Sequence, residues 1–317
     1  MVNIFPPITE LRKSKKEFCS TIECFINDIS PNNLNTKPLW FRTSYLHYRS
    51  RVTSIDRLIE STFTVHSKDI SIILKSNKLI DYLIGDTLAA PYNKIRIVAP
   101  SVGNLKNLKK SFFYFKKYSR FTELKLCLDA ITFISGKNII AFTCIEAPGL
   151  IFLKPRKDNE SIMFYCEHLL HEISHISLNY ILFDIDEYFK IDPFKEVFNS
   201  PFRMEKRGLY HVIHASYVLS RIVLFFTRMY NSKLMNDKNL RHEILGRLAL
   251  SSFRLEETIP EITGNFYTQK GKSIYNFILN TSKTHSYRKN IFVNKYNIAN
   301  QSIEYNHDLF TNSNKLT

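Results

Sequence analysis

Helical periodicity of apolar positions runs through both ends of the chain, and short β-branched segments occupy its centre. The periodic stretches predict helices at residues 8–29, 52–88 (with a break near 67–69), 160–182, 205–231, 236–257 and 270–282. Segments rich in Val, Ile, Thr and Phe predict strands at residues 95–99, 130–134, 139–144 and 150–153. The tetrapeptide Ser-Gly-Lys-Asn at residues 135–138 predicts a hairpin between the second and third of these strands.

This order of elements predicts an α+β fold with a small central β-sheet and a mainly helical C-terminal half that carries the chemistry. We expect a single catalytic domain over residues 1–283. Within it, residues 1–90 are helical, residues 91–155 are mixed α/β and residues 156–283 are helical. Residues 284–317 are polar, basic and rich in Asn, which predicts a frayed tail.

Composition narrows the class of protein. An apolar share of 44% with 25 Phe and 17 Tyr is typical of a folded globular chain. Gly is scarce, with 8 residues, and no G-x-G-x-x-G or P-loop motif occurs. Five scattered cysteines without a CxxC pair, and an N-terminus without a signal-peptide pattern, indicate a cytoplasmic protein with reduced thiols. The most apolar stretch, residues 222–226, is too short to span a membrane.

The strongest chemical signal is the pentapeptide His171-Glu172-Ile-Ser-His175 inside the helix predicted at 160–182. Residues four apart lie about 40° apart around a helix and one turn along its axis, so both imidazoles can hold one metal ion. Glu172 projects near the same ion, where it can hold or deprotonate a metal-bound water. A core helix with two hydrogen-bonded histidines is the alternative, because HExxH arises by chance in on the order of 1 in 100 such chains.

A metal site needs a further ligand, and the zincin patterns do not supply one clearly. The short pattern requires Gly three and His six residues after the motif, but Leu178 and Ile181 stand there. The long pattern uses a downstream glutamate. Glu196 and Glu205 are at workable distances, although neither lies in an N-E-x-x-[SD] context.

His211 and His214 are better candidates for the third ligand. They are three residues apart on the helix predicted at 205–231, so both can face one side of it. The connection from the first helix contains Asp192-Pro193 and Ser200-Pro201, which favours antiparallel packing of the two helices. Either histidine could then supply a nitrogen, whereas a surface role remains the alternative for each.

The residues around both histidine pairs resemble the HExxH-motif peptide-modification protein family. The likeness runs through residues 148–153, 168–180, 200–217 and 266–275, and covers roughly residues 145–282. That family has an HEaaH-L helix, an aPWR-x-D-x-RP-l stretch and, about forty residues on, an lHg-a-yaf helix. Its members belong to ribosomally made peptide natural-product pathways, and some are iron(II)- and 2-oxoglutarate-dependent peptide β-hydroxylases.

The resemblance implies roles for the metal-site residues one by one. His171, Glu172 and His175 match the HExxH motif. His214 matches the later family histidine, so the resemblance ranks it ahead of His211 as the third ligand.

Two arginines match the family's WR-x-D-x-R stretch, and we expect them to bind the distal carboxylate of 2-oxoglutarate, with a surface ion pair as the alternative for each. Arginine suits this role because its two parallel donors match the two oxygens of a carboxylate. Arg203 and Arg207 are four residues apart, so they would flank one pocket if the segment were helical. Four positions depart from the family pattern: Phe202 replaces Trp, Glu205 replaces Asp, Gly208 replaces Pro and Ala215 replaces Gly.

Two chemistries fit these residues. Neutral imidazoles suit iron(II) and zinc alike, and the resemblance favours iron(II)- and 2-oxoglutarate-dependent hydroxylation of a peptide. The alternative is a zinc metallopeptidase with Glu172 as general base and an arginine or Tyr210 at the oxyanion.

Charge suggests a partner. The chain has 44 basic and 29 acidic residues, a formal net charge of +15. Residues 105–121 interleave cations with aromatics, and Lys109, Lys110, Lys116 and Lys117 are expected to recruit an acidic segment of a peptide substrate. Nucleic acid and a solvated amphipathic helix are the alternatives.

Overall fold

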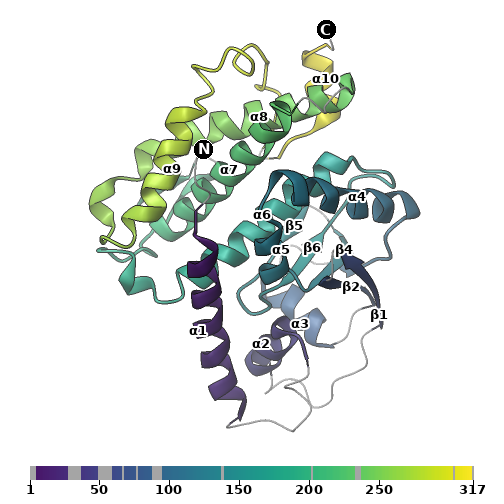
Figure 1. The fold of residues 1–317 in the computed structure, drawn as a ribbon, viewed down its shortest axis with the longest axis vertical. Coiled ribbons are helices and arrows are strands. Elements are labelled where there is room, and N and C mark those ends of the chain that lie inside the picture. Colours follow the sequence, from purple (N-terminus) through teal and green to yellow (C-terminus); the bar gives the residue numbers. More distant parts are fainter. Residues whose placement is uncertain are drawn as a thin grey trace. The chain divides into compact units, whose positions relative to one another are not determined.

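Helices, a six-stranded mixed sheet and a two-stranded antiparallel pair make up the described part of the computed structural model, which confirms the predicted α+β class (Figure 1). The structure describes residues 5–27, 37–48, 59–65, 68–75, 78–87, 95–136, 139–200, 203–232, 237–302 and 304–315. The chain forms two compact units, Ile8–Phe183 (the sheet unit) and Met1–Pro7 with Asp184–Thr317 (the helical unit). The division falls inside the region predicted to carry the metal site, and the single catalytic domain stays a prediction.

The sheet unit is built on strands β1 (Ile59–Val65), β2 (Lys68–Lys75), β3 (Arg96–Ile97), β4 (Ala130–Ser135), β5 (Ala141–Phe142) and β6 (Leu150–Leu153). Their order is β1-β2-β4-β6-β5, and β3 pairs with β4. The central strands β2, β4 and β6 are parallel, whereas β1, β3 and β5 are antiparallel to their neighbours. The sheet is therefore buried at its centre and has an antiparallel strand at each edge.

Both faces of this sheet are covered by helices (Figure 1). Even-numbered residues of β4 and β6, such as Ile134 and Phe152, pack with α2 (Leu39–Tyr48) and α3 (Lys78–Thr87). Odd-numbered residues, such as Phe133 and Leu153, are equally buried on the opposite face. Helix α6 (Ile162–Ile181) packs against β5 and β6, and α1 (Ile8–Asn27), α4 (Val102–Tyr118) and α5 (Phe121–Cys127) pack against α6.

The helical unit contains α7 (Leu209–Tyr230), α8 (Lys238–Thr258), α9 (Lys272–Thr284) and α10 (His307–Ser313), with the strands β7 (Phe198–Ser200) and β8 (Arg203–Arg207). Short 3-10 turns lie at Ile185–Glu187, Ile259–Glu261 and Gly264–Phe266. Helix α7 packs against α8 and α9. By length and composition α7 could cross a membrane, but 83% of its most apolar window is buried, as in the core helix of a globular unit.

The helix predicted over residues 52–88 is wrong for residues 59–65 and 68–75. These residues form the antiparallel pair β1–β2, and among the residues of this range that the structure describes only α3 is helical. Ile70, Ile72 and Ile73 are spaced in a way that fits either period, and their pairing with β4 decides the outcome.

The predicted hairpin between residues 130–134 and 139–144 is also wrong. Strand β5 pairs with β6, which lies between β5 and β4 in the sheet. Phe142 stacks on Phe152 with ring centroids 4.2 Å apart, and this contact favours pairing with the following strand over the preceding one. Lys137 and Asn138 of the predicted turn lie outside the described residues.

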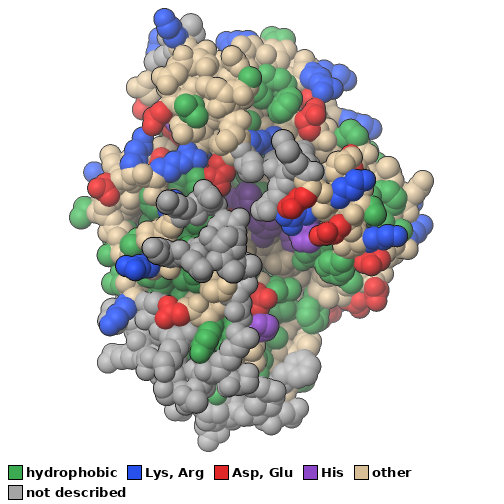
Figure 2. Space-filling model, turned by 180° about the vertical axis from the view of Figure 1, so that it is seen from behind, with side chains coloured by type: hydrophobic (Ala, Val, Ile, Leu, Met, Phe, Trp, Pro, Cys, Tyr) green, Lys and Arg blue, Asp and Glu red, His purple; other side chains and the backbone are tan. Residues whose placement is uncertain are grey.

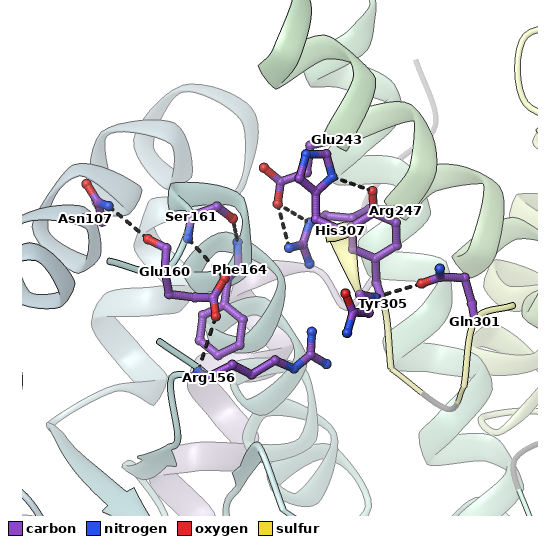
Figure 3. A network of polar contacts seen from close by, with 11 residues as sticks. Asn107, Arg156, Glu160, Ser161, Phe164, Glu243, Arg247, Gln301, Tyr305 and His307 are labelled. Carbon is purple, nitrogen blue, oxygen red and sulfur yellow. Dashed lines mark hydrogen bonds and ion pairs between the residues drawn. The ribbon is translucent and has the colours of Figure 1, made fainter. Parts of the chain in front are cut away.

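The C-terminal segment is packed rather than frayed. Tyr305 and Phe310 are buried against Leu250 of α8. Arg247 makes an ion pair with Glu243 at 2.6 Å and lies over the Tyr305 ring, as the right half of Figure 3 shows for this unit. Aromatic burial therefore holds a segment whose polar composition predicts disorder.

Candidate functional site

Helix α6 carries the HExxH residues in the sheet unit. The helix begins after Ser161, whose hydroxyl caps it by accepting a hydrogen bond from the backbone N–H of Phe164 at 3.0 Å. Most side chains of its 20 residues are buried. His171 and His175 are exceptions, because both remain partly exposed on one side of an otherwise buried helix.

The two imidazoles converge as the i,i+4 spacing predicts. The Nε2 atoms of His171 and His175 are 3.1 Å apart. An ion bound to both at the usual zinc–nitrogen distance of about 2.0–2.1 Å would subtend an angle of roughly 95–100° at the metal. That angle is close to what four- and six-coordinate ions accept, so the pair fits a transition metal. The same separation also suits a single N–H···N hydrogen bond in the metal-free protein.

Glu172 lies beside this pair and is almost fully buried, with 3% of its side chain exposed. Its Oε1 is 4.0 Å from Nε2 of His171, too far for a direct hydrogen bond. The carboxylate is therefore close to the exposed imidazole edge without occupying it. A carboxylate in this position can accept a proton from a water molecule bound to a metal ion that His171 and His175 ligate.

Burial keeps the His171 imidazole neutral. It lowers the pKa of His171 from 6.5 to about 4, although 41% of the side chain remains exposed. A neutral imidazole has a lone pair for a metal, so His171 needs no deprotonation to bind one at neutral pH.

The start of α6 is held by a loop that the sequence did not single out. The backbone N–H of Glu160 donates to Asn104 of α4 at 2.9 Å, and Asn107 donates to the Glu160 carbonyl at 2.9 Å. The Glu160 carboxylate accepts from the backbone N–H groups of Arg156 and Ser161, as the left half of Figure 3 shows. Side chains of α4 thus fix the residues that precede the HExxH helix. In the sequence, only the asparagines at the start of α4 indicate that this helix could form hydrogen bonds to a neighbouring loop.

His214 lies on α7 in the helical unit, and its place in the metal site stays a prediction. It is buried and packs against Tyr210 with ring centroids 4.3 Å apart and the ring planes tilted by 44°, whereas His211 is exposed. Burial, assisted by His211, lowers the pKa of His214 to about 3. Burial also raises the pKa of Tyr210 to about 12. The imidazole of His214 is therefore neutral at physiological pH, as a metal ligand must be.

The two arginines lie on strand β8, so a helical arrangement of the pair is wrong. Residues two apart share one face of a strand, and Arg207 makes an ion pair with Glu205 of the same strand.

Gly208 is the residue that follows β8, and it is the N-cap residue of α7. A Cβ there would lie 2.5 Å from the carbonyl oxygen of Pro193, so the family's proline would collide with the backbone in this chain.

Further ligands do not emerge from the part of the chain that the structure describes. Within it, no group of three or more His, Cys, Asp or Glu side chains is arranged to hold a metal ion. Glu196 is exposed, and Glu205 is paired with Arg207. The described site is thus the pair His171 and His175 with Glu172 beside it.

No protein-family model matches the chain, and no curated protein matches it significantly by sequence. Membership of the HExxH peptide-modification family therefore stays a hypothesis based on the motifs.

Proposed function

We propose that this protein is a metal-dependent enzyme that modifies a peptide, by hydroxylation with iron(II) and 2-oxoglutarate. One observation carries the metal assignment: the Nε2 atoms of His171 and His175 converge to 3.1 Å on the partly exposed side of α6. The preference for oxidation over hydrolysis comes from the motif resemblance.

The donors present fit a metal ion that keeps open coordination positions. His171 and His175 supply two neutral nitrogens, and His214 is proposed as the third. Bound iron(II) would supply redox chemistry with dioxygen, whereas bound zinc would supply Lewis acidity. In either case the residues of α6 hold and orient the reacting groups.

Glu172 would place a carboxylate that can accept a proton or a hydrogen bond close to the metal. Its carboxylate is buried and lies 4.0 Å from Nε2 of His171. In a hydroxylase it would position a hydrogen-bonding group beside the ligands. In a hydrolase it would remove the proton from the attacking water, and this placement is what favours a zinc metallopeptidase as the second candidate.

A peptide substrate is supported by the edge of the sheet next to α6. Strand β5 pairs on one side with β6, where the Ile140 carbonyl accepts a hydrogen bond from the backbone N–H of Lys154. Antiparallel strands alternate their bonding direction, so the N–H and C=O of Ala141 point away from β6. Among the described strands none pairs with β5 on that side. An extended peptide could add there as a further strand.

The assignment of 2-oxoglutarate depends on the arginines of β8. Arg207 is 25% exposed and makes an ion pair with Glu205. Its guanidinium has five N–H donors, so the ion pair leaves further donors for a carboxylate of 2-oxoglutarate.

All five cysteines are free thiols, which fits the proposed cytoplasmic location.

Succinate formation tests this function. Protein purified without oxygen is loaded with one equivalent of iron(II) and given 2-oxoglutarate and dioxygen. We expect slow succinate release from the wild type, and none from His175→Ala or from zinc-loaded protein. If iron-loaded protein forms no succinate while zinc-loaded protein cleaves casein peptides, the hydroxylase function is refuted and the zinc metallopeptidase is the function that the result supports.

A further inference from the structure

An exposed stripe of lysines runs along helix α4, on the side away from the sheet unit's core. Every exposed residue of this helix belongs to it: Val102, Lys106, Lys109, Lys110, Phe113, Lys116 and Lys117. At 100° per residue these seven positions fall within an arc of about 120°. Figure 2 shows basic and acidic side chains interspersed over one face of the molecule. By contrast, α4 contains five lysines and no Asp or Glu.

The centre of the α4 stripe is an aromatic ring framed by cations. Phe113 is 60% exposed, and lysines stand at positions −4, −3, +3 and +4 from it, which are its neighbours on a helix surface. The ammonium group of Lys117 lies 5.9 Å from the centroid of the Phe113 ring. Burying an aromatic ring between four positive charges requires a partner with both apolar and negative groups.

The opposite face of α4 fixes the stripe to the HExxH helix. Leu108, Phe112 and Phe115 are buried on that face, and α4 packs against α6. The Sγ of Cys166 in α6 is 3.9 Å from the backbone oxygen of Ser111 in α4. The stripe and the histidines of the HExxH motif, His171 and His175, are therefore held on adjacent helices of one compact unit.

We propose that the α4 stripe docks an acidic segment of the peptide substrate, with an apolar side chain of that segment packed on Phe113. Charge complementarity selects this occupant, because five lysines between positions 106 and 117 of one helix produce a strong positive potential along about 17 Å. A membrane-binding helix would present a broad apolar face, but here the apolar face is buried in the core. Single-stranded nucleic acid is bound on several aromatic platforms, and the stripe has one exposed ring.

The inference rests on the proposed function and adds a constraint to it. The stripe faces away from α6, so a peptide must cross on the order of two helix diameters, about 20 Å, to reach His171. An extended chain spans about 3.3 Å per residue. The acidic segment should therefore lie at least about six residues from the modified residue, and docking would raise the local concentration of the latter.

Fluorescence anisotropy with a defined probe tests the docking. The probe is a labelled dodecapeptide of Glu and Asp with one central Phe, and its Gln/Asn counterpart is the uncharged control. Lys109→Glu with Lys117→Glu should weaken binding by about ten-fold, and Phe113→Ser by about three-fold. Binding to the wild type should also weaken from 50 to 300 mM NaCl, since exposed charges are screened. The matched control is Lys283→Glu with Lys289→Glu, which makes the same change in net charge on exposed lysines of the helical unit.

Equal weakening by the control pair would refute the α4 stripe as the docking site. Tighter binding of random duplex DNA or of phosphatidylserine vesicles than of the acidic probe would refute an acidic peptide as its occupant. The same titration on metal-free His175→Ala separates the two proposals. If His175→Ala binds the probe and the wild type shows no turnover, the proposed enzyme function is refuted and the proposed docking site is not.

Discussion

Gly103→Ala should destabilise the protein even though alanine is the better helix former. Gly103 lies in the first turn of α4, where the loop preceding the HExxH helix crosses it. A Cβ at this position would lie 2.9 Å from the backbone oxygen of Asp158 and 3.0 Å from Oδ1 of Asn159. The nearest atom belongs to the backbone, so relief requires the loop itself to move.

The magnitude follows from two opposing effects. Replacing Gly by Ala within a helix contributes up to about 1 kcal/mol of stability through propensity. Inserting a methyl group into a filled contact costs about 1–3 kcal/mol. We therefore expect the free energy of unfolding of Gly103→Ala to fall by roughly 1 kcal/mol. Gly85→Ala in α3 is the matched control, because a Cβ there meets nothing within 4 Å. It should raise the free energy of unfolding by about 1 kcal/mol.

Urea unfolding followed by circular dichroism measures both variants. The two should differ by roughly 2 kcal/mol, with Gly103→Ala also binding cobalt(II) more weakly because the clamped loop sets the start of α6. If Gly103→Ala is stabilised as much as Gly85→Ala, the loop does not pack on α4 as described. Helix α4 would then not position the HExxH helix.

Three further predictions concern the site. Glu172→Gln should retain full metal content; a loss of turnover by about 10²-fold or more would indicate a general base, and a smaller loss a positioning role. Arg203→Lys or Arg207→Lys should raise the 2-oxoglutarate concentration needed for half-maximal succinate release, because lysine lacks the paired donors; unchanged dependence in both would remove these arginines from the cosubstrate site. In metal-free protein, the pKa of His214 is about 3 when folded and 6.5 when unfolded, so the unfolded state binds more protons below pH 6.5. Stability should fall by about 1.4 kcal/mol per pH unit from this group as pH decreases from 6.5 towards 3; urea titrations of His214→Gln should show a correspondingly flatter pH profile, and an unchanged profile would contradict this burial.

The helices that proved predictable are those whose pattern is decided locally. Residues 162–181 contain no Gly or Pro and begin at a serine cap, so α6 was predicted within two residues at either end. The convergence of His171 and His175 follows from helix geometry alone. The strand pair β1–β2 is not predicted because the pairing of β2 with the distant strand β4 decides it, and the hairpin prediction for β5 takes the preceding strand β4 as partner instead of the following strand β6.

Other features depend on contacts that leave little trace in one sequence. Asn104 and Glu160 are 56 residues apart, and their hydrogen bond has no periodic signal. The helix predicted at 205–231 begins too early, since residues 205–207 belong to a short strand whose partner is residues 198–200. Similarly, the burial of Phe310 against α8 orders a C-terminal segment that composition marks as polar.

Metal content of the anaerobically purified protein tests the central claim most directly. The wild type should bind one equivalent of iron(II) or zinc, measured by mass spectrometry after gel filtration. His171→Ala and His175→Ala should each lose it, because each removes one of two nitrogens placed 3.1 Å apart. His211→Ala, an exposed histidine, should retain it. Stoichiometric metal in either α6 variant, or none in the wild type after reconstitution, would contradict the proposed metal centre.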